Sequence, residues 1–306
     1  MISGSVVALV TPMLANGELD WDGLQRLVQF HLEQRTDAIL VCGTTGESAT
    51  LTVTEQGEII EQVLAGVGGR IPVIVGCSSS ATRDAVHLAA QARSLGADAC
   101  LVAAPAYNKP TQEGLYQHFL SISRAVPLPM ILYNVPGRTA VDILPETVER
   151  LADLDTVIAI KEASGSLERA LVLLERVGDR MAVLSGDDAT AAELVLKGGS
   201  GVISVTANVA PAQMHKLCTL AREGKEQQAR ALNEHLLPLH EVLFAETNPI
   251  PVKYALHRMQ LIDNGIRLPL TPLSTELHAR VDEALATTEG PLASAQVQQA
   301  TFKDAR

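Results

Sequence analysis

Residues 130–161 have the sequence MILYNVPGRTAVDILPETVERLADLDTVIAIK, in which two short apolar runs enclose an amphipathic stretch. The runs, at 130–134 and 157–161, carry no charge until they end, which is typical of strands buried on both faces of a parallel sheet. Between them, residues 144–151 have the apolar pattern of a helix, with a proline in its first turn. The segment therefore predicts one β–α–β unit.

Apolar runs of this kind recur at intervals of roughly 20 to 35 residues, which is the spacing of βα units. We count eight, beginning near Val6, Ala38, Val73, Cys100, Met130, Val157, Ala182 and Val202. Helical patterns lie between them, at 22–34, 55–65, 83–95, 113–125, 144–151, 167–176 and 190–197. No run looks like a polar edge strand, and no GxGxxG motif opens the first unit. We therefore expect an α/β fold, a closed (β/α)8 TIM barrel rather than an open eight-stranded sheet.

The strand pattern stops at Pro211, and only helical patterns follow it. They cover residues 212–223, 226–244, 251–259 and 274–285. The last stretch of the chain is polar and lacks clear periodicity. These features predict a barrel with the active site over residues 1–210, a C-terminal helical appendage over 211–286, and a mobile tail over 287–306.

The composition excludes several classes of partner. With 24 basic and 35 acidic residues, the 306-residue chain has a formal charge of −11, which argues against nucleic acid or an anionic membrane as the main partner. The first 13 residues lack the pattern of a secretory signal, so we expect none, and no apolar run comes near the ~18 residues of a membrane helix. The four cysteines lie far apart, which suits buried thiols better than disulfides or a zinc site. We expect a cytoplasmic protein.

Catalytic groups of barrel enzymes lie at the C-terminal ends of the strands. Lys161 ends the sixth apolar run. A lysine kept away from water can form a Schiff base with a keto acid, although a lysine at a strand end can equally reach solvent. Tyr133 lies at the end of the preceding run and Tyr107 follows the run before that, in a chain that is only 3% aromatic. Each phenol could move protons or could hydrogen-bond to backbone.

Two other strand ends carry groups that could bind carboxylates. Thr44 and Thr45 lie in a glycine-rich loop whose hydroxyls and N–H groups could grip an anion, or which could be a plain turn. Arg138 follows a Pro-Gly turn and suits bidentate binding of a second carboxylate, or it could lie on the surface.

We predict no metal site. Asp187 and Asp188 precede a helix, so a role in capping is favoured over metal binding. His235 and His240 are five residues apart and do not share a helix face.

Several motifs together identify a family. In chain order they are GTTGES (43–48), AYNKPTQEGLYQHF (106–119), ILYNVPGRT (131–139), AIKEASG (159–165), SGDDAT (185–190), GVISVTANVAP (201–211) and NPIPVK (248–253). This set resembles the bacterial dihydrodipicolinate synthase family of pyruvate-dependent class I aldolases, over nearly the whole chain. The shorter motifs occur across the wider aldolase family, whereas YNVPGRT and NPIPVK are more specific to the synthase branch.

The resemblance implies a lyase that condenses pyruvate with L-aspartate-4-semialdehyde, the first committed step of diaminopimelate and lysine biosynthesis, without a cofactor. Lys161 would form the Schiff base. A proton relay would consist of Tyr133, Thr44 and Tyr107, the last supplied by a neighbouring subunit. The substrate contacts implied are Thr45 with the pyruvate carboxylate, Arg138 with the semialdehyde carboxylate, and the backbone of Gly186 and Ile203. The family is usually a homotetramer, a dimer of tight dimers.

The sequence departs from the family at the positions linked to inhibition by lysine. Relatives that lysine inhibits typically have Tyr where Ala106 stands, His at Gln56 and often at Val53, Asn at Ser80 and Glu at Asp84. The ring and hydrogen bonds that would hold lysine are therefore missing. We predict weak or absent feedback inhibition.

Two other functions remain open at this point. One is a related aldolase that cleaves a longer 2-keto acid, such as N-acetylneuraminate, a 2-keto-3-deoxy-sugar acid or 4-hydroxy-2-oxoglutarate. Arg138 argues against it, because sugar-acid lyases usually lack an arginine there. The other is a barrel that binds a small molecule without catalysis. The complete set of relay residues argues against it, because binding alone does not require a proton relay.

Overall fold

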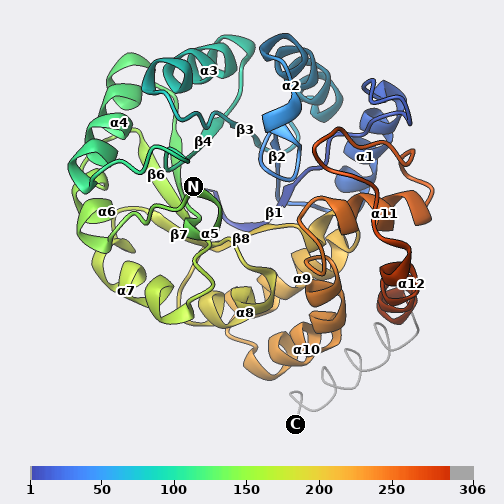
Figure 1. Cartoon of the computed structure of the whole chain (residues 1–306). Helices are drawn as coiled ribbons and strands as arrows, with labels where there is room; N and C mark the ends of the chain where they lie inside the picture. The colour runs from blue at the N-terminus through green and yellow to red at the C-terminus, as the bar shows by residue number, and fades with distance from the viewer. Residues whose placement is uncertain (1, 290–306) are drawn as a thin grey trace.

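The computed structural model describes residues 2–289. Its eight strands are all parallel, each pairs with the next, and the last pairs with the first, so the barrel is closed (Figure 1). The strands are β1 (Gly4–Ala8), β2 (Ala38–Val41), β3 (Val73–Gly76), β4 (Ala99–Ala103), β5 (Met130–Asn134), β6 (Val157–Glu162), β7 (Ala182–Ser185) and β8 (Gly201–Ser204). The predicted TIM barrel is confirmed.

A ring of helices surrounds the barrel (Figure 1). These are α1 (Trp21–Glu33), α2 (Val53–Val67), α3 (Thr82–Leu95), α4 (Gln112–Ala125), α6 (Pro145–Leu151), α7 (Leu167–Val177), α8 (Asp188–Leu196) and α9 (Pro211–Arg222). The short helix α5 (Pro136–Thr139) and two 3-10 turns, η1 (Ser48–Thr50) and η2 (Thr206–Asn208), lie after strand ends. Helix α9, the first helix of the expected appendage, packs against β1 and α8 and completes the ring.

The remaining helices are α10 (Glu226–Val242), α11 (Ile250–Arg258) and α12 (Thr275–Glu289), gathered on one side of the barrel (Figure 1). Helix α10 packs against α8, α9 and α12, and so joins the appendage to the ring. Residues 287–289, where the tail was expected to start, continue α12; the rest of that expected tail lies outside the described residues. Within residues 2–289, no helix has the length and apolarity needed to cross a membrane.

Aliphatic side chains fill the inside of the barrel. Those buried there, as one cluster, are Ile2, Val6, Ala8, Ala38, Leu40, Ile74, Ala99, Leu101, Ile131, Tyr133, Val135, Ala159, Ala182, Leu184 and Ile203. A second and larger cluster lies between the strands and the helices. Tyr133 is the one ring among the described members of the inner cluster, so this core explains how the barrel packs with few aromatic residues.

Side-chain caps fix two helix starts, that of Asp187 as expected, and the expected burial of the thiols is confirmed. Thr52 and Glu55 form a capping box at the start of α2, and Asp187 caps α8 by accepting from the N–H of Ala189 at 3.2 Å. All four cysteines are buried and free. Burial raises the pKa of Cys42 to about 12, so this thiol is unreactive at neutral pH.

Candidate active site

Two adjoining cavities open at the C-terminal ends of the strands. The first, of about 450 Å³, contains Lys161 and is called the Lys161 cavity; the second, of about 400 Å³, is lined by Ala106 and is called the Ala106 cavity. They share a wall made of Thr44, Leu101, Tyr133, Val135, Arg138 and Asn248. The mouth of the barrel therefore holds one continuous site with two lobes.

Lys161 and Tyr133 form the floor of the Lys161 cavity. They are direct neighbours on β6 and β5, and the Lys161 ammonium lies 4.5 Å from the centroid of the Tyr133 ring. Lys161 is only 6% exposed. Because side chains alternate along a strand, both residues point inward while the next residues, Glu162 and Asn134, point out. The amine and the phenol thus meet in a largely apolar setting.

Gly186 gives Lys161 its space. A Cβ atom at this position would lie 2.9 Å from Cε of Lys161 and 2.5 Å from Cβ of Ala163. Both distances are too short for real contacts, so a side chain here would displace the lysine. Gly186 also donates its N–H to the carbonyl of Glu162 at 2.7 Å, which joins the ends of β7 and β6.

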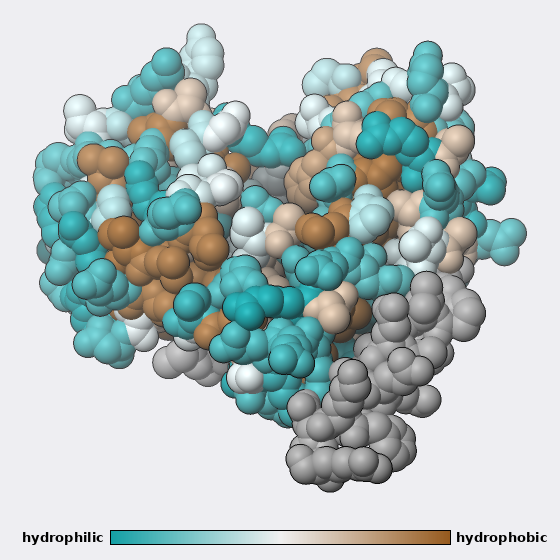
Figure 2. All heavy atoms as spheres, turned by 90° about the horizontal axis from the view of Figure 1, so that it is seen from below, coloured by the Kyte–Doolittle hydropathy of each residue, from teal (hydrophilic) through white to brown (hydrophobic). Residues whose placement is uncertain are grey.

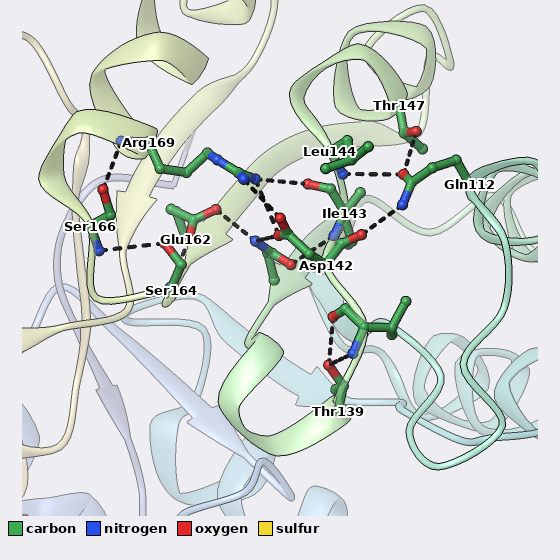
Figure 3. A network of polar contacts seen from close by, with 12 residues as sticks. Gln112, Thr139, Asp142, Ile143, Leu144, Thr147, Glu162, Ser164, Ser166 and Arg169 are labelled. Atoms are coloured by element: carbon green, nitrogen blue, oxygen red, sulfur yellow. Dashed lines mark hydrogen bonds and ion pairs between the residues drawn. The ribbon is translucent and has the colours of Figure 1, made fainter.

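Polar contacts on the outer side of β5 and β6 hold the ends of these two strands together (Figure 3). The Asn134 amide donates to Glu162 at 3.0 Å and to Asp142 at 2.8 Å, and Asp142 pairs with Arg169 at 2.7 Å. Asn134 also accepts from the N–H of Ile143 at 3.0 Å. These contacts fix the loop that carries Arg138 relative to Lys161.

Asn248 connects Thr45 and Arg138, the two residues predicted to bind carboxylates. The sequence analysis did not predict this role for Asn248. Its side-chain N–H donates to the Thr45 hydroxyl at 3.0 Å, and its backbone carbonyl accepts from Arg138 at 3.1 Å. Because the Thr45 oxygen already accepts from Asn248, its own hydrogen is free to donate to a ligand. The available signal was the motif NPIPVK, which begins at Asn248.

A buried ion pair anchors the loop that carries Thr44 and Thr45 to the C-terminal appendage. The sequence analysis did not predict this pair. The Glu47 carboxylate contacts the Lys253 ammonium on α11, and the backbone N–H of Arg267 donates to the same carboxylate at 3.2 Å. Burial lowers the pKa of Lys253, and the negative charge of Glu47 opposes this shift. Glu47 has a left-handed φ of 54°, which the pair helps to hold.

The structure brings together most of the predicted site residues. Those lining the Lys161 cavity are Lys161, Tyr133, Thr44, Thr45, Arg138 and Gly186. Ile203 belongs to the inner barrel cluster and is not among the residues that line either cavity. Tyr107 is 94% exposed, has a φ of 75°, and lines neither cavity. A single chain therefore does not place this phenol beside Lys161.

Acidic residues form another wall of the Lys161 cavity. Asp188 accepts from the N–H groups of Val205 and Thr206 at 3.0 and 2.9 Å, so it joins α8 to the end of β8 instead of capping the helix. Desolvation and the nearby charge of Asp188 raise the pKa of Asp187. In the described part of the chain, no group of three His, Cys, Asp or Glu side chains is arranged to hold a metal.

Comparisons with known proteins agree over nearly the full length. The model of the dihydrodipicolinate synthetase family matches residues 1–288. A 4-hydroxy-tetrahydrodipicolinate synthase from Pseudomonas aeruginosa is 59% identical over 288 residues, which is 94% of this chain and 99% of the relative. The enzyme of that name from Marinobacter nauticus is 56% identical over 93% of this chain and 98% of its own.

Solved structures show the same similarity. A dihydrodipicolinate synthase from Acinetobacter baumannii, described as chloride-inhibited and complexed with pyruvate, is 50% identical with a TM-score of 0.93, over 94% of this chain and 99% of that chain. A monomeric dihydrodipicolinate synthase variant is 43% identical with a TM-score of 0.92, over 94% and 97% of the two chains. On the strength of the shared fold and these matches, this chain belongs to the dihydrodipicolinate synthetase family.

Proposed function

We propose that this protein condenses pyruvate with L-aspartate-4-semialdehyde to form 4-hydroxy-tetrahydrodipicolinate, as its relatives' names indicate. The observation that carries the proposal is the buried Lys161 beside Tyr133, in a cavity that also holds Arg138. A buried amine suits Schiff-base formation with a keto acid, and a guanidinium suits a second substrate that bears a carboxylate. The product would enter lysine biosynthesis.

The reaction follows from this arrangement. The Lys161 amine attacks the pyruvate ketone while the Thr45 hydroxyl holds the carboxylate, and loss of water gives an iminium ion. The iminium accepts electrons, so a methyl proton leaves and an enamine forms. The enamine attacks the aldehyde carbon of the second substrate. The amine of that substrate then closes the ring and releases Lys161.

Proton movement in these steps is assigned to Tyr133, Thr44 and the Tyr107 of a neighbouring copy. We therefore propose a homo-oligomer, with a tetramer as the expected form. In the single chain, Tyr107 is 94% exposed and Leu268 is 79% exposed. Exposure of such large side chains favours a surface that another copy of the chain covers. Figure 2 shows a further apolar patch on the side where Figure 1 places α7, which carries the exposed Val172. Free buried thiols suit the reducing cytoplasm, where we place the enzyme.

A panel of substrates tests the proposed reaction. We expect turnover of pyruvate with L-aspartate-4-semialdehyde in a coupled assay, and no cleavage of N-acetylneuraminate or 2-keto-3-deoxygluconate. The reason is that Arg138 supplies a site for the carboxylate of a short semialdehyde. Efficient cleavage of either longer acid would support the rival aldolase function, and no turnover of any substrate would support a non-catalytic barrel.

Lysine is expected to inhibit weakly. None of the Ala106-cavity residues at positions 48, 49, 80 and 106 carries an aromatic ring. The Gln56 amide is already directed at the Ser48 carbonyl at 3.4 Å. Losing one or two hydrogen bonds to a charged ligand weakens binding about ten- to a hundredfold. A titration with millimolar lysine should therefore leave most of the activity. Strong inhibition in that range would contradict the prediction, and the variant Ala106→Tyr tests the missing ring directly.

A further inference from the structure

Strand β6 contains one more residue than the stretch of β5 that it pairs with. Met130 pairs with Val157, but the next residue, Ile131, pairs with Ala159, so Ile158 is the extra residue. Such a β-bulge changes the direction of the side chains that follow it. Val157 belongs to the core between the strands and the helices, whereas Ile158 and Ala159 both pack with the core inside the barrel. Two successive side chains of β6 therefore face inward.

The bulge decides which way Lys161 points. In a regular strand whose Val157 faces outward, side chains alternate, so Lys161 would also face outward and Glu162 would face the mouth. The extra residue reverses this order and places Lys161 opposite Tyr133. The amine proposed to form the Schiff base thus reaches the mouth only because β6 is bulged.

The hydrophobic pattern of β6 does not select the bulged arrangement. Residues 157–160 are all apolar, so the bulged and the regular strand both place apolar side chains on both faces. Backbone hydrogen bonds do not select it either, because a strand that slips by one residue can form its ladder again. The selection must come from a side-chain contact that only one arrangement allows.

Glu162 and Asn134 make such a contact on the outer side of the barrel. The Asn134 amide donates to Oε2 of Glu162 at 3.0 Å, and the backbone N–H of Ser164 donates to Oε1 at 2.7 Å (Figure 3). Glu162 is 4% exposed and Asn134 is fully buried. A buried carboxylate needs such donors, and Glu162 would lose the Asn134 amide if it turned into the mouth. The contact therefore exists only when Lys161 points inward.

We propose that Glu162 and Asn134 are positioning residues, whose hydrogen bond holds β6 in the bulged register and keeps the Lys161 amine beside Tyr133. They act through the strand, since neither of them lines the Lys161 cavity or the Ala106 cavity. Without the contact, a smaller fraction of molecules would present the lysine to the ketone. This inference rests on the role proposed above for Lys161 in the Schiff base.

The rate of borohydride trapping with pyruvate tests the proposal. Glu162→Met keeps the length of the side chain without an acceptor, so trapping at Lys161 should slow about ten- to a hundredfold, the scale of one lost hydrogen bond to a charged group. Glu162→Gln keeps one acceptor oxygen and should trap faster than Glu162→Met. If the two variants slow equally, the charge of Glu162 acts on Lys161 and the positioning role is refuted. Unchanged trapping in both also refutes it.

Deletion of Ile158 supplies a readout that a merely structural role would not move. Without the extra residue, Ala159 follows Val157 directly, and ordinary alternation turns Lys161 inward. Adding Glu162→Met to this deletion should therefore slow trapping at most a few fold, and the full loss in this background would refute the proposal. If circular dichroism shows that the deletion variant is unfolded, a crystal structure of Glu162→Met decides. Lys161 turned out of the mouth supports the proposal, and an unchanged strand refutes it.

Thr156→Val is the matched control for loss of a hydrogen bond at this strand. The Thr156 hydroxyl donates to Ser123 at 2.7 Å just before β6 begins, so its loss should lower stability and leave the trapping rate unchanged. Equal slowing in this control would show that trapping only follows stability, and would refute the positioning role. In the unmodified protein, absence of any adduct on Lys161 would instead refute the proposed function itself.

Discussion

Replacing Lys161 with arginine is expected to lower kcat by on the order of a thousandfold or more, the scale expected when a covalent nucleophile is removed. Arginine keeps the positive charge in the cavity, but its guanidinium does not form a Schiff base with a ketone. Activity is measured in the coupled assay. After borohydride reduction with pyruvate, intact-mass analysis should show an adduct on the unmodified protein and none on Lys161→Arg.

The matched control for this prediction is Lys197→Arg. Lys197 is exposed at the end of α8, and its replacement should change neither the rate nor the adduct. A pyruvyl adduct that persists in Lys161→Arg would place the Schiff base on another lysine. Loss of the adduct with retained turnover would show that the reaction does not pass through a Schiff base at all.

The strands could be predicted from the sequence because each is a continuous apolar run. Strands β1 and β8 begin at Gly4 and Gly201, before the apolar runs predicted from Val6 and Val202. These glycines pair across the closing seam of the barrel, and a Cβ on Gly201 would lie 2.1 Å from the Gly4 carbonyl oxygen. Close approach of two backbones requires glycine, and a hydrophobic pattern gives no sign of it.

The positions of Lys161 and Tyr133 at the barrel mouth could also be predicted, because both lie at the C-terminal ends of apolar runs. The contacts that support them could not. Asn248 and Lys253 lie 203 and 206 residues from their partners Thr45 and Glu47. No spacing rule relates side chains so far apart, and α10 and α11 had to be placed before either contact could be recognised. Tyr107 lines neither cavity of the single chain, and its proposed role rests on a second copy, which no single-chain pattern predicts.

Replacing Lys253 with methionine is expected to destabilise the protein by about 3–5 kcal/mol, because it leaves the Glu47 charge buried without a partner. The side chains of Glu47 and Lys253 are 0% and 5% exposed. The free energy of unfolding is measured from urea denaturation. The exposed pair Arg230–Glu193 supplies the control, and Arg230→Met should cost less than about 1 kcal/mol.

The double variant Glu47→Gln/Lys253→Met separates the pair's contribution to stability from its role in the site. Removing both charges should restore much of the lost stability, because a buried ion pair gains little over neutral groups. It should not restore activity. Glu47 shares its loop with Thr44 and Thr45 and holds a left-handed φ of 54°, so loosening its anchor should raise KM for pyruvate while the barrel stays folded. A double variant that regains both stability and the original KM would show that the ion pair only offsets the cost of burying its own two charges and has no role in the site.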